Sequence, residues 1–162
     1  MIENKIQWKG IVIHHSLTED NESVSWEAIR KYHIETNGWQ DIGYNFGIEY
    51  GKGNEVILEE GRSLDIPGAH TKGFNHTHIG ICVVGNYDKM TLEPDKESVL
   101  LDMIHILIKD YDIKVADIIG HWESFILLNQ APNKLEAQLI KSCPGRLFDL
   151  DNLRNKIKDK IS

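Results

Sequence analysis

The stretch "HIGICVVGNY", residues 78–87, constrains the fold most, because it is a near-continuous apolar run rich in β-branched residues. Strands that are buried on one face alternate apolar and polar residues, whereas a continuous run fits a central strand that is covered on both faces. Such a strand needs a layer on each side of its sheet. The run therefore favours a layered architecture with the sheet in the middle.

The segments around this run support an α/β arrangement. "GIVIHH" at 10–15 and "VADIIGH" at 115–121 are short apolar runs that end in histidine, and 43–61 has the pattern of two strands joined by a tight turn at 51–54. Apolar spacing predicts helices over 25–37, where Ser25 can cap and Trp26, Ile29, Tyr32 and His33 share a face, over 95–110, and from 149 or 151 to 161. We predict one mixed central β-sheet flanked by helices.

Length and composition fit a single compact domain over residues 1–162, with 41% apolar and 27% charged residues. The formal charge of -7 gives no general footprint for nucleic acid or an anionic membrane. No stretch is long and apolar enough for a membrane span, and the N-terminal residues lack a signal-peptide core, so we expect a cytosolic starting point. Cys82 and Cys143 are then expected to be separate thiols.

Three residues could carry metal chemistry. His14 and His121 each follow a predicted strand, where ligands of α/β sheets gather, and Cys143 stands in "KSCPG", where proline and glycine fix a turn. Two imidazoles and a thiolate form a zinc set that leaves a fourth position open, as in catalytic sites. The three positions lie far apart in the chain, so the spacing alone leaves a surface or capping role open for each.

Five motifs, in order, resemble the zinc-dependent N-acetylmuramoyl-L-alanine amidases, a family that includes phage endolysins and peptidoglycan recognition proteins. They are "IVIHHS", "GYNFGI", "IPGAHTKGFNHTHIGICVVGNYD", "GHWE" and "KSCPG", and they cover nearly the whole chain. The resemblance implies the mixed-sheet fold of that family and a zinc ion held by His14, His121 and Cys143. It also implies that His15, the second histidine of "HHS", packs beside the site and is not a ligand.

The resemblance assigns further roles. Tyr44 of "GYNF" matches the tyrosine that hydrogen-bonds near the metal-bound water, and Lys141 matches the lysine that meets developing negative charge. Without the resemblance, Tyr44 is as readily a packing residue and Lys141 a solvated one. His70 lies in the Gly- and Pro-rich stretch 61–75, which we expect to be a long ordered loop, and either lines a groove and contacts substrate or is a plain loop residue.

This chain departs from the pattern of the amidase family at two places. Related amidases of the muropeptide-recycling branch carry glutamate where this chain has Cys82 and aspartate where it has Cys143, so the phage and recognition-protein branch fits better. We expect Cys82 to be a small core residue. The segment 123–140 is longer and more apolar than the family pattern, and its "FILL" run is either an exposed patch or a short packed helix.

The resemblance implies an enzyme that hydrolyses the amide between N-acetylmuramic acid and L-alanine in peptidoglycan, with Zn²⁺ as cofactor. The alternative is a recognition module that binds peptidoglycan without cutting it. We expect a monomer that meets peptidoglycan, and neither nucleic acid nor membrane, after release by a holin or by lysis.

Overall fold

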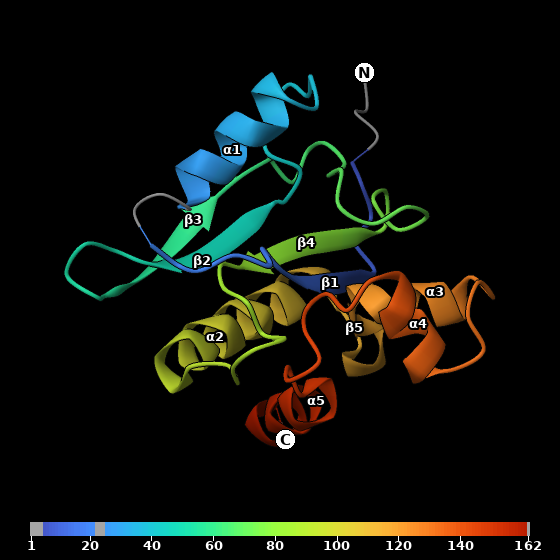
Figure 1. The fold of residues 1–162 in the computed structure, drawn as a ribbon. Helices are drawn as coiled ribbons and strands as arrows, with labels where there is room; N and C mark the ends of the chain where they lie inside the picture. The colour runs from blue at the N-terminus through green and yellow to red at the C-terminus, as the bar shows by residue number, and fades with distance from the viewer. Residues whose placement is uncertain (1–4, 22–24, 162) are drawn as a thin grey trace.

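The computed structural model describes residues 5–21 and 25–161. Its centre is a five-stranded sheet with the strand order β3-β2-β4-β1-β5 (Figure 1). The strands are β1 (Gly10–His15), β2 (Phe46–Tyr50), β3 (Val56–Glu60), β4 (His78–Val83) and β5 (Ile118–Gly120). The predicted mixed sheet is confirmed, since β3 runs antiparallel to β2 and the other neighbouring pairs are parallel.

The central strand prediction is also confirmed. β4 lies between β2 and β1, and its residues from Ile79 to Val83 are buried. The strand ends before Gly85, whose φ of 154° turns the chain out of the sheet. The tight turn predicted at 51–54 joins β2 to β3, with Asn54 in the left-handed region at φ 61°.

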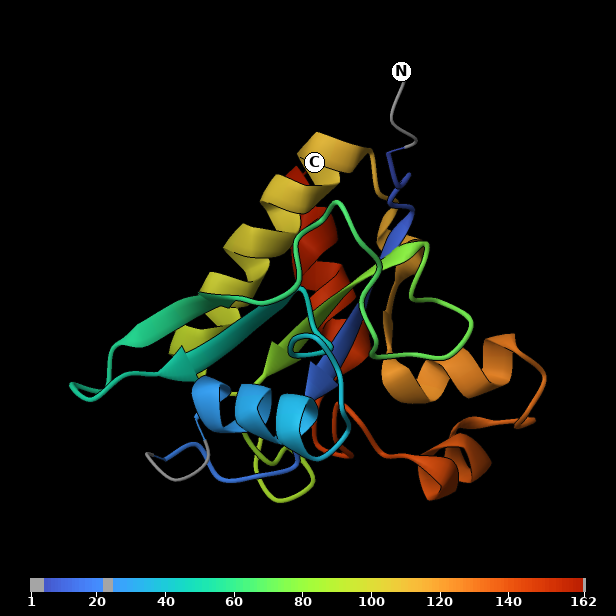
Figure 2. The same ribbon diagram turned by 90° about the horizontal axis from the view of Figure 1, so that it is seen from above.

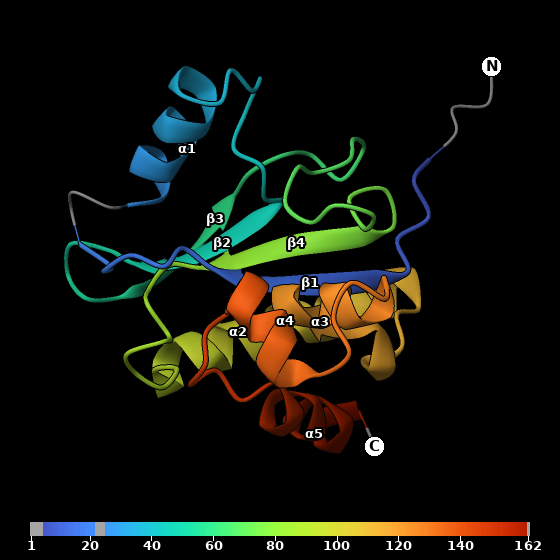
Figure 3. The same cartoon turned by 45° about the vertical axis from the view of Figure 1, so that its right-hand side comes forward.

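Helices cover both faces of the sheet. Helix α1 (Trp26–Glu35), which Ser25 caps as predicted, lies on one face with the long loop 61–77, while α2 (Pro94–Tyr111) and α5 (Leu150–Ile161) lie on the other (Figures 1 and 3). Seen from above, α1 crosses the strands at an angle (Figure 2). The main apolar core lies under α2 and α5, where Leu100, Ile104 and Leu153 pack against the sheet.

The face under α1 has a smaller apolar cluster. Trp26 packs there with Ile42, Cys82 and Val84. The Trp26 ring lies against the backbone of Gly47, where a Cβ atom would meet the ring at 2.3 Å. Cys82 is fully buried, which confirms the prediction of a core thiol. Tyr32 was predicted to share a helix face with Trp26, but it is 58% exposed, whereas Trp26 is buried.

The segment between β5 and Cys143 is more regular than its sequence suggests. It forms α3 (His121–Leu127) and α4 (Lys134–Ile140), with Asn133 capping α4. Of the "FILL" run, Phe125 to Leu127 are helical, and Leu127 and Leu128 at its end are exposed. His121 is the first residue of α3 and follows directly on β5. None of the described helices is long and apolar enough to cross a bilayer.

Candidate metal site and substrate pocket

His14, His121 and Cys143 come together at one edge of the sheet. His14 is near the end of β1, His121 follows β5, and Cys143 lies in the loop after α4. Because β1 and β5 are parallel neighbours, their carboxyl ends meet at the same edge. One ligand atom from each of the three residues lies within 4.8 Å of the others.

The donor set fits a zinc ion. His14 Nδ1 and Cys143 Sγ are 3.5 Å apart, and ligands of tetrahedral zinc with usual bond lengths are separated by about 3.6 Å. Burial lowers the pKa of His14 and lowers that of His121 to about 4, so both imidazoles are neutral at pH 7 and can coordinate. Burial raises the pKa of the Cys143 thiol to about 12, so metal binding must displace its proton.

The His14 ring is oriented by its other nitrogen. His14 Nε2 is 3.0 Å from Nδ1 of His70 and 3.2 Å from the Thr71 hydroxyl. His70 Nε2 is 3.2 Å from the carbonyl of His78, which can only accept, so that nitrogen carries the proton, and His70 Nδ1 can accept from His14 or from the Thr71 hydroxyl 3.0 Å away. With its proton on Nε2, His14 presents an unprotonated Nδ1 to the side of Cys143.

A glycine makes room for this arrangement. A Cβ atom on Gly80 of β4 would meet the His70 ring at 2.5 Å. The loop beside it is fixed by Asn75, whose Oδ1 accepts from the backbone N–H groups of His70 and Thr71 at 2.8 and 2.9 Å. The His70 imidazole is therefore held directly over the strand.

The loop that carries Cys143 is held from several sides. The Asp88 carboxylate accepts from the Ser142 hydroxyl and from the Arg146 backbone N–H, both at 2.8 Å. The backbone N–H of His15 lies 3.3 Å from Cys143 Sγ, and the Trp122 N–H donates to the Cys143 carbonyl at 2.9 Å. These hydrogen bonds orient the Cys143 sulfur even when no metal ion is bound.

Tyr44 lies against the metal site. Its ring centroid is 5.1 Å from that of His14, and its side chain packs against the apolar cluster that contains the buried Cys82. Burial raises the pKa of Tyr44 well above its ordinary value, so the hydroxyl stays protonated at neutral pH and can donate a hydrogen bond. Tyr44 thus lies between His14 and the apolar cluster under α1.

A pocket of about 530 Å³ opens over these residues. Lys141 lines it and is exposed, and its positive charge lowers the pKa of His121. His70, for which both a groove role and a plain loop role were open, also lines it. The pocket lining also includes Leu17, His33 and Trp39, which were not predicted as site residues. The helix pattern assigned His33 only to the face of Trp26, and no local signal marked the other two.

His15 is turned away from the three candidate ligands. Its Nδ1 accepts from the backbone N–H of Tyr87 at 3.1 Å, and its ring stacks on that of Tyr87 with the ring planes 28° apart. It lies outside the cluster of possible ligands found among the described residues. The geometry agrees with a packing role.

Known proteins share this fold. The structure of N-acetylmuramoyl-L-alanine amidase LysC from Clostridium intestinale URNW superimposes with a TM-score of 0.71 over 95% of this chain and 87% of its own, at 23% identity. Bumblebee PGRP-SA superimposes with a TM-score of 0.65 over 94% of this chain and 81% of its own, at 28% identity.

Sequence comparison gives relatives of two kinds. The endolysin of Enterobacteria phage K11 is 36% identical over 100 residues, which are 59% of this chain and 63% of the endolysin. Peptidoglycan-recognition protein SC1a of Drosophila melanogaster is 36% identical over 99 residues, 58% of this chain and 51% of its own. The matches thus span about half to two thirds of these relatives. A family profile for N-acetylmuramoyl-L-alanine amidase matches residues 4–146. The chain therefore belongs to the N-acetylmuramoyl-L-alanine amidase family.

Proposed function

We propose that this protein hydrolyses the amide bond between the lactyl group of N-acetylmuramic acid and L-alanine in bacterial peptidoglycan, with zinc bound by His14, His121 and Cys143. The observation that carries this proposal is the cluster of two imidazoles and one thiol at the floor of an open pocket in a member of the amidase family. An endolysin role is supported by the phage relatives.

The chemistry requires an activated water, because an amide is a poor electrophile. A zinc ion at this site supplies Lewis acidity toward water and toward the scissile carbonyl. The three protein ligands leave one coordination position for that purpose. The described residues of the ligand cluster include no fourth protein donor.

Tyr44 and Lys141 are proposed to stabilise the charge that develops during hydrolysis. The protonated Tyr44 hydroxyl can donate toward a nucleophilic water or an oxyanion beside His14. The Lys141 ammonium lies two residues from Cys143 on the pocket wall and can approach the same oxyanion. His70, on the same wall, is proposed to contact the glycan or peptide with the edge of its ring.

Release and assembly belong to the same proposal. We infer that the protein acts as a monomer on peptidoglycan and reaches the wall after holin action or lysis. Its formal charge of -7 favours neither nucleic acid nor an anionic membrane as a partner.

The test is mass spectrometry of products from purified peptidoglycan of the diaminopimelate and lysine chemotypes, with and without a chelator. The proposal expects free L-alanine N-termini and intact lactyl groups, with the products abolished by the chelator and by Cys143→Ser. The competing function is a recognition module, which the recognition-protein relatives favour. Stoichiometric zinc and wall binding without any new N-terminus would establish that module and overturn the enzyme.

A further inference from the structure

Leu17 has a backbone conformation that its side chain does not favour. Its φ is 61°, in the left-handed region. Among the described non-glycine residues, the other positive φ values belong to Asn54, Asp112 and Asn129. Asparagine and aspartate tolerate this region because their short polar side chains bond to the local backbone, whereas leucine gains no such compensation. Leu17 is therefore the strained member of this group.

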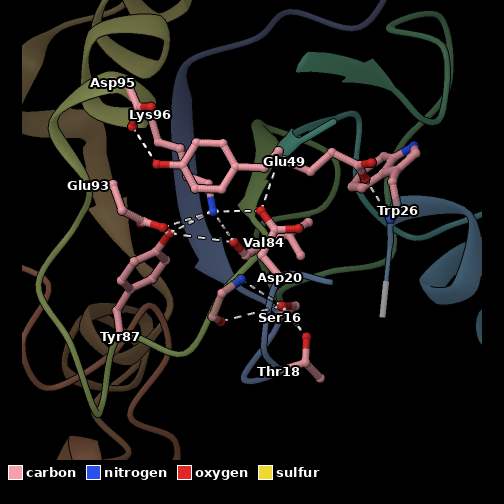
Figure 4. Close-up of polar contacts among 12 residues, drawn as sticks. Ser16, Thr18, Asp20, Trp26, Glu49, Val84, Tyr87, Glu93, Asp95 and Lys96 are labelled. Atoms are coloured by element: carbon pink, nitrogen blue, oxygen red, sulfur yellow. Dashed lines mark hydrogen bonds and ion pairs between the residues drawn. The ribbon is translucent and has the colours of Figure 1, made fainter. Parts of the chain in front are cut away.

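The residues on either side of Leu17 hold it in place (Figure 4). Ser16 Oγ accepts from the Gly85 backbone N–H at 2.9 Å and lies 2.6 Å from the Thr18 hydroxyl. Further along, the Asp20 carboxylate lies 2.8 Å from the ammonium of Lys96. These contacts tie the segment to the end of β4 and to helix α2.

Lys96 makes this attachment strong. Its side chain is fully buried, and its ammonium also lies 3.2 Å from Glu93 and donates to the Val84 carbonyl at 2.8 Å (Figure 4). If Asp20 moved away, the buried Lys96 ammonium would lose one of the negative charges that offset its desolvation. The ion pair therefore resists movement of residues 16–20. The strain at Leu17 is thus imposed by surrounding structure.

The strained backbone conformation of Leu17 does not bury its side chain in the apolar core. The Leu17 side chain is 56% exposed and lines the same pocket as His14, Lys141 and Cys143. A strained residue that persists beside an active site, with its apolar side chain turned to solvent, indicates a role in function. The exposed side chain offers an apolar surface three residues from a metal ligand.

We infer that Leu17 determines substrate specificity by contacting a methyl group that flanks the scissile amide. This inference rests on the proposed function. The bond to be cleaved has a lactyl methyl on one side and an alanine methyl on the other, and both present the same small aliphatic chemistry to Leu17.

The experiment compares three soluble muropeptides: the parent N-acetylmuramoyl-L-alanyl peptide, the same compound with glycine in place of L-alanine, and the same compound with a glycolyl in place of the lactyl group. Their kcat/KM values are measured for wild-type protein and for Leu17→Asn, which suits a left-handed φ and removes the apolar contact. Leu17→Met restores an apolar side chain. Leu135→Gln, on α4 outside the pocket and 72% exposed, is the control for loss of an exposed leucine.

Wild-type protein is expected to prefer the parent over one of the two demethylated compounds by on the order of tenfold, mainly through KM. Leu17→Asn should lose that preference while its Tm stays equal or rises, and Leu17→Met should recover it. If Leu17→Asn no longer prefers the parent over the glycine compound, Leu17 contacts the alanine methyl. If it no longer prefers the parent over the glycolyl compound, Leu17 contacts the lactyl methyl. Equal preferences in wild type and Leu17→Asn in both arms would overturn the inference.

Failure of the proposed function is read separately, from wild-type protein with the parent compound. If that compound is not cleaved, calorimetric affinities of the same three compounds for wild type and Leu17→Asn make the same comparison. A methyl preference in binding that Leu17→Asn abolishes supports the inference for a binding module. Absence of both cleavage and binding overturns the function and the inference together.

Discussion

At the scale of single residues, His14 is fixed at both ring nitrogens before any metal arrives. Nδ1 faces Cys143, and Nε2 faces His70, whose own Nε2 is satisfied by a backbone carbonyl. A ligand whose tautomer and ring orientation are set in advance loses less entropy when it binds a metal. The His70 side chain, which contacts His14 Nε2, should therefore contribute to metal affinity.

His70→Ala is predicted to weaken zinc binding by about 10- to 100-fold, because it removes the nearer of two polar partners of His14 Nε2 and leaves the Thr71 hydroxyl. Competition with a chromogenic chelator measures the affinity. His76→Ala is the matched control, since His76 is an exposed histidine of the same loop. Unchanged affinity in His70→Ala would show that the tautomer of His14 is set in some other way.

Tyr44→Phe is predicted to keep zinc and to lower kcat by about 100- to 1,000-fold, as expected when one hydrogen-bond donor to a developing oxyanion is removed. Metal content and turnover are measured on the same preparation. Tyr32→Phe, at an exposed tyrosine of α1, should change neither. Normal turnover in Tyr44→Phe would remove its hydroxyl from the mechanism.

At the scale of elements, one carboxylate holds the loop that carries Cys143. Asp88 bonds to both sides of Cys143, through Ser142 and Arg146, although it follows β4 and the loop follows α4.

Asp88→Ala is predicted to lower zinc affinity by about tenfold or more, because the loop loses both bonds. Chelator competition checks the affinity, with the exposed Asp65→Ala as control. Equal affinity in both variants would contradict the role of Asp88.

The elements themselves were predictable to different degrees. Continuous β-branched runs located β1, β4 and β5, and the apolar spacing of Leu100, Ile104 and Leu107 located α2, because each of these elements buries the residues that define its pattern. Helix α4 was overlooked for the opposite reason. Its apolar residues Leu135 and Leu139 are each 72% exposed, so their spacing does not trace a buried face.

At the scale of the whole molecule, the strand ends predicted that His14 and His121 lie close together, but the contacts behind them could not be predicted. The hydrogen bonds of His70 to His14 and of Asp88 to Ser142 join residues more than fifty positions apart. No periodicity or turn signal encodes such pairs, because they depend on how the loops 61–77 and 84–93 cross the sheet edge. The metal ligands were named through the family resemblance and not through their spacing.

Buried neutral histidines also set the pH range of the fold. Burial lowers the pKa of His15 from 6.5 to about 4, so the unfolded chain binds more protons than the folded one between these values. The contribution of His15 to stability is therefore complete above about pH 6.5 and is lost as the pH falls toward 4. His15 alone contributes up to about 3 kcal/mol to this loss.

His15→Asn should reduce the pH dependence of the unfolding free energy of metal-free protein. The asparagine carbonyl can accept from the Tyr87 N–H and does not titrate. Urea unfolding of both proteins at pH 7 and pH 4.5 measures the difference. A loss of stability of equal size in both proteins would exclude His15 as a contributor.

The most direct test of the account is the metal content and X-ray absorption spectrum of purified protein, measured together with amide hydrolysis. The account predicts one zinc per chain, coordinated by one sulfur and by nitrogen or oxygen donors, and the loss of zinc and of hydrolysis together in His14→Ala and Cys143→Ser. Full hydrolysis by metal-free protein, or zinc bound without a sulfur ligand, would contradict it.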